Sequence, residues 1–132
     1  MFTSKDAQNA ILALKDIKGV ERARLIEKIL RLETAHFRSK QYQLSGSAGM
    51  EAGNWKDLDP KSYTTFQMND NHLTGEKKLR TFIKWNNVLD FCIYLSDYID
   101  RHGGNYARWN STNPERQDKY INKVNSIKAR FV

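Results

Sequence analysis

Hydrophobic and polar positions follow helical spacing at both ends of the chain, with one long polar stretch between them. The apolar run after Ser4 predicts a first helix that ends near Gly19. Residues 20–37, rich in Glu, Arg, Leu and Ile, predict a second helix. Residues 39–75 are dense in Gly, Ser, Asn and Asp, and they predict ordered loop with a short strand or hairpin over residues 62–68.

Two further helices are predicted after the polar stretch. Residues 76–102 carry apolar side chains on nearly every side, which predicts one long, largely buried central helix that stops at Gly103. The fourth helix should begin with Thr112 or Asn113 as its cap and Pro114 in its first turn. Its apolar stripe consists of Tyr120, Val124, Ile127 and Phe131. The pattern therefore predicts a predominantly α-helical α+β domain over residues 1–132, with a small loop or β-hairpin lobe.

One acidic residue, Glu33, breaks the pattern of the second predicted helix. On a helical wheel with about 100° per residue, it lies between Ile29 and Phe37 in the middle of the apolar arc, whereas Glu27 falls on the polar side. A carboxylate there is costly to ionise unless it is paired, so we expect a raised pKa. A glutamate that is partly protonated near neutral pH suits a general acid for glycosidic cleavage. The alternative is a frayed helix end, where Glu33 reaches water or pairs with Arg38.

Composition narrows the class of protein without deciding its function. The net charge of +7 favours an anionic partner, such as nucleic acid, an anionic surface or a cell-wall polymer, and is equally typical of a basic surface with no such role. Cys92 stands alone inside an apolar run, which excludes an intrachain disulfide and indicates a buried side chain. We expect no signal peptide and no membrane span, because charged residues interrupt every apolar stretch.

No cofactor or metal is expected from the motifs. The histidines His36, His72 and His102 lack the spacing of metal ligands on a helix, although His36 is close enough to Glu33 to border a cleft. The chain has no phosphate-binding loop, no dinucleotide fingerprint and no Ser-His-Asp order.

Two segments, LIEKILRLETAHFRSKQYQLSGSAGM and STNPERQDKYINKVNSI, together resemble lysozyme-like peptidoglycan hydrolases. The likeness is closest to the glucosaminidase family of flagellar and autolysin enzymes, and it spans about residues 20–130. The resemblance implies a monomer that acts on peptidoglycan glycan strands, with Glu33 as catalytic acid. It also implies that Tyr120, with Tyr106 as the fallback, is the tyrosine of the active site. The substrate-binding residues that it suggests are Ser39, Ser47 and Met50, with Trp55 and Trp109 as faces for sugar stacking. Tyr63 and Trp85 are further aromatic candidates, and Trp85 is assigned to the core.

The second acid of that family has no clear counterpart. Where many members carry Thr-Thr-Glu, this chain has Thr-Thr-Phe, ending at Phe66. Asp70, Glu76 and Glu51 are the candidates to replace it. A mechanism in which the N-acetyl group of the substrate supplies the nucleophile requires no second acid.

Several functions stay open at this point. A glucosaminidase, a muramidase and a lytic transglycosylase all fit the resemblance. The alternative is a basic helical binding module or an inactive lysozyme-like domain that serves in a phage or secretion assembly. Lys and Arg are spread over all four predicted helices, which counts against nucleic acid as the partner. Action on the bacterial cell wall would require a phage-encoded protein or another export route.

Overall fold

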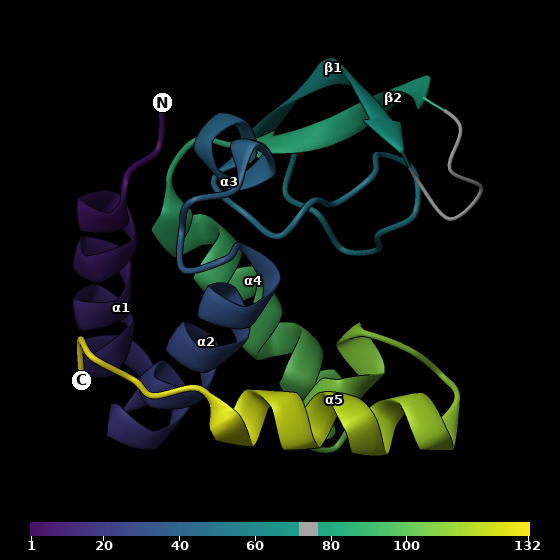
Figure 1. Cartoon of the computed structure of the whole chain (residues 1–132). Helices are drawn as coiled ribbons and strands as arrows, with labels where there is room; N and C mark the ends of the chain where they lie inside the picture. The colour runs from purple at the N-terminus through teal and green to yellow at the C-terminus, as the bar shows by residue number, and fades with distance from the viewer. Residues whose placement is uncertain (72–76) are drawn as a thin grey trace.

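The structure, a computed structural model, describes residues 1–71 and 77–132, with side chains described to residue 69 and from residue 77. The described residues confirm a predominantly helical α+β fold in which a β-hairpin stands beside the helices (Figure 1). The elements in chain order are α1 Ser4–Lys18, α2 Val20–Glu33, α3 Lys40–Ser45, β1 Tyr63–Asn71, β2 Lys77–Trp85, α4 Val88–Arg101, the 3-10 helix η1 Tyr106–Trp109 and α5 Pro114–Ser126.

The first helix is confirmed, and its ends follow from local chemistry. The Thr3 side chain accepts a hydrogen bond from the Asp6 backbone N–H, and the Asp6 carboxylate accepts one from the Thr3 N–H, which forms a capping box. Gly19 ends α1 at a φ of 94° and leads directly into α2. The buried face of α1 packs against α2 and α4 and consists of Ala7, Ala10, Ile11 and Leu14.

The single central helix predicted over residues 76–102 is wrong. Residues 77–85 form strand β2, which pairs antiparallel with β1 in a register that sets Tyr63 opposite Trp85 and Phe66 opposite Phe82. The predicted strand at residues 62–68 thus corresponds to β1 alone, and its partner comes from the supposed helix. Thr81, Phe82 and Ile83 suit a pleated surface, and β1 supplies the hydrogen bonds that a helix would have made internally.

Helix α4 begins only after the strand, and it forms the centre of the core. Asn87 caps it by accepting a hydrogen bond from the Asp90 backbone N–H at 2.9 Å. Cys92 is fully buried on this helix, as its apolar run predicts. Trp85 lies in the core as expected, although it belongs to a strand.

The last helix confirms its predicted start. Asn113 caps α5 by accepting a hydrogen bond from the Arg116 backbone N–H, and Pro114 occupies the first turn. Tyr120 and Val124 are buried, and the helix ends at Ser126. The remaining C-terminal residues then run as an extended segment toward α1 and α2 (Figure 1).

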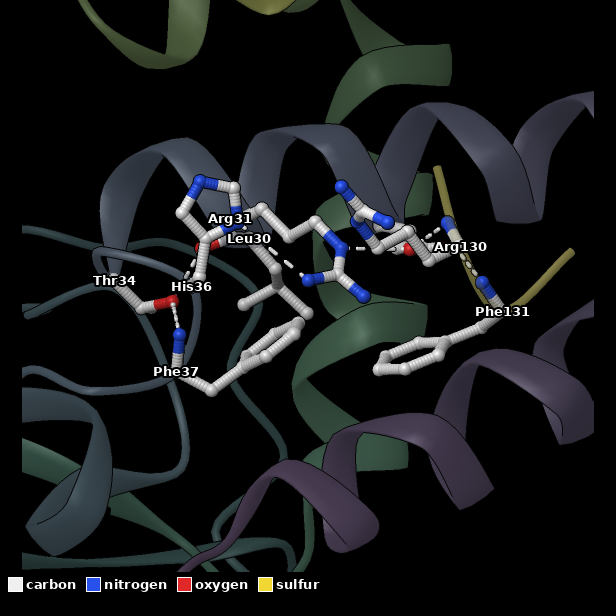
Figure 2. Close-up of polar contacts among 8 residues, drawn as sticks. Leu30, Arg31, Thr34, His36, Phe37, Arg130 and Phe131 are labelled. Carbon is white, nitrogen blue, oxygen red and sulfur yellow. Dashed lines mark hydrogen bonds and ion pairs between the residues drawn. The ribbon is translucent and has the colours of Figure 1, made fainter. Parts of the chain in front are cut away.

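Glu27 is fully buried, which corrects its placement on the polar side of the helical wheel. Its carboxylate accepts hydrogen bonds from Arg31 Nε at 2.7 Å, from the Arg130 backbone N–H at 2.6 Å and from the Phe131 backbone N–H at 3.0 Å. The Arg31 guanidinium lies 4.5 Å from the centroid of the Phe131 ring and 5.0 Å from that of Phe37 (Figure 2). The C-terminal segment therefore covers a helix face that would otherwise be exposed, and the charges beneath it are paired.

The described residues contain no helix that is long and apolar enough to cross a membrane. Within the same part of the chain, no group of three or more His, Cys, Asp and Glu side chains is arranged to hold a metal ion.

Candidate active site

Glu33 is the last residue of α2, because a left-handed turn begins just after it. The predicted helix over residues 20–37 is therefore too long. Ala35, His36 and Phe37 have φ angles of 50°, 57° and 68°, a conformation that L-residues rarely adopt. Strain of this kind is typical of functional sites and persists only when the surroundings hold it.

Hydrogen bonds from Thr34 hold this turn. The buried Thr34 hydroxyl donates to the Leu30 carbonyl oxygen and accepts from the Phe37 backbone N–H at 2.9 Å (Figure 2). The Thr34 carbonyl oxygen accepts from the Ser39 backbone N–H at 3.0 Å. These bonds fix the backbone conformation of the turn that follows Glu33 at the end of α2.

The carboxyl group of Glu33 lines a cleft of about 350 Å³. The other residues of this Glu33 cleft are Ala48, Gly49, Met50, Trp55, Trp109 and Asn110. Burial raises the pKa of Glu33, as predicted, while the Tyr120 hydroxyl and the charge of Lys123 act in the opposite direction. Glu33 forms no ion pair with Arg38 or with any other cation in the described part of the chain, and Arg38 Nε instead donates to the Ala35 carbonyl oxygen.

Tyr120 lies beside Glu33 and is 4% exposed. Burial and the neighbouring Glu33 carboxylate raise the pKa of Tyr120 well above its usual range, so the phenol stays neutral. Its hydroxyl adjoins the carboxyl group but falls short of hydrogen-bond geometry, and it has no other partner among the described residues. The Tyr106 ring packs on Tyr120 with 6.5 Å between centroids. A neutral donor is therefore available next to the Glu33 carboxyl group.

The structure brings some of the predicted substrate-binding residues to Glu33 and places others elsewhere. Met50, Trp55 and Trp109 line the Glu33 cleft. Ser39 instead caps α3 through the Tyr42 backbone N–H. Ser47 is fully buried against Ser45. Neither serine lines the cleft, so their positions correspond to local structural roles.

The candidates for a second acid do not meet Glu33 in the described part of the chain. Glu51 lies at 3.3 Å from Arg80 in an ion pair and does not line the Glu33 cleft. Phe66, at the position of the missing acid, packs on Phe82 in the hairpin with 6.0 Å between ring centroids. The side chain of Asp70 and the whole of Glu76 lie outside the described residues, as does His72.

A second cleft, which the sequence analysis missed, adjoins the first. It has a volume of about 680 Å³ and shares Trp55, Trp109 and Asn110 with the Glu33 cleft. The two indole rings pack against each other, with centroids 4.5 Å apart and planes tilted by 30°. Helix α4 contributes Tyr94, Tyr98 and Arg101 to this cleft, and His102, which follows the helix, lines it as well. The spacing of Tyr94 and Tyr98 by four residues was a visible signal, but both were counted among the apolar residues of a largely buried helix.

We compared the chain with protein-family models, with curated proteins and with solved structures, and none of them matches it. The chemistry of the cleft indicates what the site can do. Glu33 can supply a proton, and the uncharged Tyr120 lies next to it. The packed indole rings of Trp55 and Trp109 add an apolar wall to the same cleft, against which a sugar ring can pack.

Proposed function

We propose that the protein is a glycoside hydrolase that cleaves the glycan strands of bacterial peptidoglycan, with Glu33 as general acid. The observation that carries this proposal is the half-buried Glu33 carboxyl group, whose pKa is raised, in an open cleft beside Trp55 and Trp109. A carboxyl group whose pKa is raised by burial keeps its proton to higher pH and can protonate the leaving oxygen of a glycosidic bond.

The chemistry assigns separate roles to the groups of the cleft. Glu33 donates its proton to the glycosidic oxygen as the bond from that oxygen to the anomeric carbon breaks, and the sugar passes through an oxocarbenium-like state. The Glu33 carboxylate then takes a proton back from the water that completes hydrolysis. The Tyr120 hydroxyl and Lys123 both favour the charged form of Glu33, so they stabilise the carboxylate between these two steps.

The lining of the Glu33 cleft indicates which group can act as the nucleophile. No second carboxylate lines the Glu33 cleft among the side chains that the structure describes. This favours attack by the N-acetyl group of the substrate, or by a water that a neutral group orients, over attack by a protein carboxylate. Glucosaminidase, muramidase and lytic transglycosylase activity each remain compatible with the cleft and differ in their products.

Two properties support peptidoglycan as the glycan. The sequence around Glu33 and Tyr120 resembles that of lysozyme-like peptidoglycan hydrolases. The net charge of +7 suits a cell-wall polymer that carries many carboxylates and phosphates.

Digestion of purified peptidoglycan tests the proposal. The wild-type protein should release soluble muropeptides, and mass spectrometry of their ends should identify the bond that is cut. Glu33→Gln should abolish release while the variant stays folded. Glu21→Gln, on the same helix but 88% exposed, should retain full activity. Intact peptidoglycan after prolonged incubation with the wild-type protein would overturn the proposal.

A second candidate is a glycan-binding module without catalytic activity. The absence of a second carboxylate from the lining of the Glu33 cleft, within the described side chains, is the observation that favours it. Such a module would sediment with peptidoglycan and release no muropeptides. It would also bind equally well with Glu33→Gln, because its affinity would come from Trp55 and Trp109.

A further inference from the structure

The second cleft differs from the Glu33 cleft in its charge. We call it the Tyr98 cleft, and its lining includes three cations, Lys56, Arg101 and Arg108, and one carboxylate, Asp57. The Glu33 cleft, by contrast, has no cation among the described residues that line it. A ligand that extends across both clefts therefore meets a proton donor at one end and excess positive charge at the other.

The arginines of the Tyr98 cleft are available to a ligand. Arg101 lies 4.0 Å from Asp57, at the outer limit of an ion pair, and 5.8 Å from the centroid of the Tyr98 ring. Arg108 is half-buried, and no carboxylate of the described residues lies within 4.0 Å of it. A partly desolvated guanidinium without a partner is well suited to a carboxylate, because its planar fork can make two parallel hydrogen bonds.

The backbone and the rings around these arginines fix the shape of the cleft. The Tyr98 hydroxyl donates to the Arg108 carbonyl oxygen at 3.2 Å, which ties η1 to α4. The Trp109 ring meets the Tyr98 ring edge to face, with 5.0 Å between centroids. Trp55 lines both clefts, and its buried Nε1 has no hydrogen-bond partner in the described part of the chain.

We propose that the Tyr98 cleft binds a carboxylate carried by the glycan, while Glu33 acts on a glycosidic bond nearby. The inference rests on the proposed function and adds a substrate class to it: glycans that bear a carboxyl group, as opposed to neutral glycans of the same length. Trp55 and Trp109, which line both clefts, contact the sugar, and Arg108 with Arg101 selects the charged substituent.

Calorimetric titration of the Glu33→Gln protein tests this inference without catalytic turnover. Three probes separate sugar from charge: neutral chitotetraose, N-acetylglucosaminyl-N-acetylmuramic acid that carries a stem peptide with free carboxyl groups, and the same molecule with those carboxyl groups amidated. The carboxylate form should bind more tightly than the amide form. Adding Arg108→Gln should weaken the carboxylate form by about tenfold, as expected for the loss of a charge-assisted hydrogen bond, and leave both neutral probes within about twofold.

The controls separate failure of the inference from failure of the proposed function. Arg116→Gln, an exposed arginine of α5 outside both clefts, should change none of the affinities. Arg108→Lys keeps the charge without the fork and should bind the carboxylate form with intermediate affinity. Equal binding of the carboxylate and amide forms, or an equal loss for all probes in Arg108→Gln, would overturn the inference while peptidoglycan digestion by the wild-type protein stands. Charge-selective binding without digestion would overturn only the proposed function, and binding of no probe would overturn only the inference.

Discussion

Replacing Glu27 by alanine tests the buried carboxylate that pairs with Arg31 within α2 and accepts hydrogen bonds from the backbone of the C-terminal segment. The change removes a fully buried carboxylate and leaves the Arg31 side chain, which is 8% exposed, without its partner. The backbone N–H groups of Arg130 and Phe131 lose their acceptor at the same time. The Phe131 ring, which stacks on Phe37 at 5.7 Å, then loses its anchor beside the left-handed turn.

The expected cost is large for a chain of 132 residues. Breaking a buried ion pair by removing one partner costs about 3–5 kcal/mol, because an uncompensated charge stays in a poorly solvated site. Against a typical free energy of unfolding of about 5–15 kcal/mol, this is a substantial fraction. Urea denaturation followed by circular dichroism measures the loss, provided that the slope of the transition is unchanged.

Two further variants show whether the buried charge is the cause. Glu21→Ala removes an exposed partner of Arg24 from the same helix and should change the free energy of unfolding by less than about 0.5 kcal/mol. The double variant Glu27→Ala with Arg31→Met removes both charges and should recover part of the loss. A loss of less than about 1 kcal/mol in Glu27→Ala, or no recovery in the double variant, would refute the argument.

Three more predictions concern the end of α2. Burial raises the pKa of Glu33 above its ordinary value of 4.5, so the folded state binds more protons than the unfolded state in the window above 4.5, and stability falls as pH rises through it. The free energy of unfolding of Glu33→Gln, measured in denaturation curves, should therefore rise relative to that of the wild type between pH 4 and pH 7. An equal rise in Glu21→Gln would contradict burial of Glu33 as the cause. Ala35→Gly relieves a φ of 50° and should raise the free energy of unfolding by up to about 1 kcal/mol, whereas Ala13→Gly within α1 should lower it by a similar amount. Thr34→Val leaves a backbone N–H of the turn without its acceptor and should cost about 1–3 kcal/mol in thermal or urea unfolding, with a loss of muropeptide release.

The sequence by itself determined where α1 and α5 begin. Thr3 and Asp6 begin α1, and Asn113 with Pro114 begins α5, because caps and first turns involve only residues a few positions apart. The sequence also singled out Glu33, since a carboxylate between Ile29 and Phe37 contradicts the periodicity of its own helix. Its raised pKa follows from that position.

Tertiary structure alone decided the features that depend on distant partners. Residues 77–85 have enough apolar side chains for either a helix or a strand, and pairing with β1 selected the strand. Glu27 looks exposed on a wheel, but the backbone of Arg130, 103 residues later, covers it. The cleft likewise joins Glu33 at the end of one helix to Trp55 in a loop and Trp109 in η1. A sequence pattern records the period of one element, whereas burial and pairing depend on which other element packs against it.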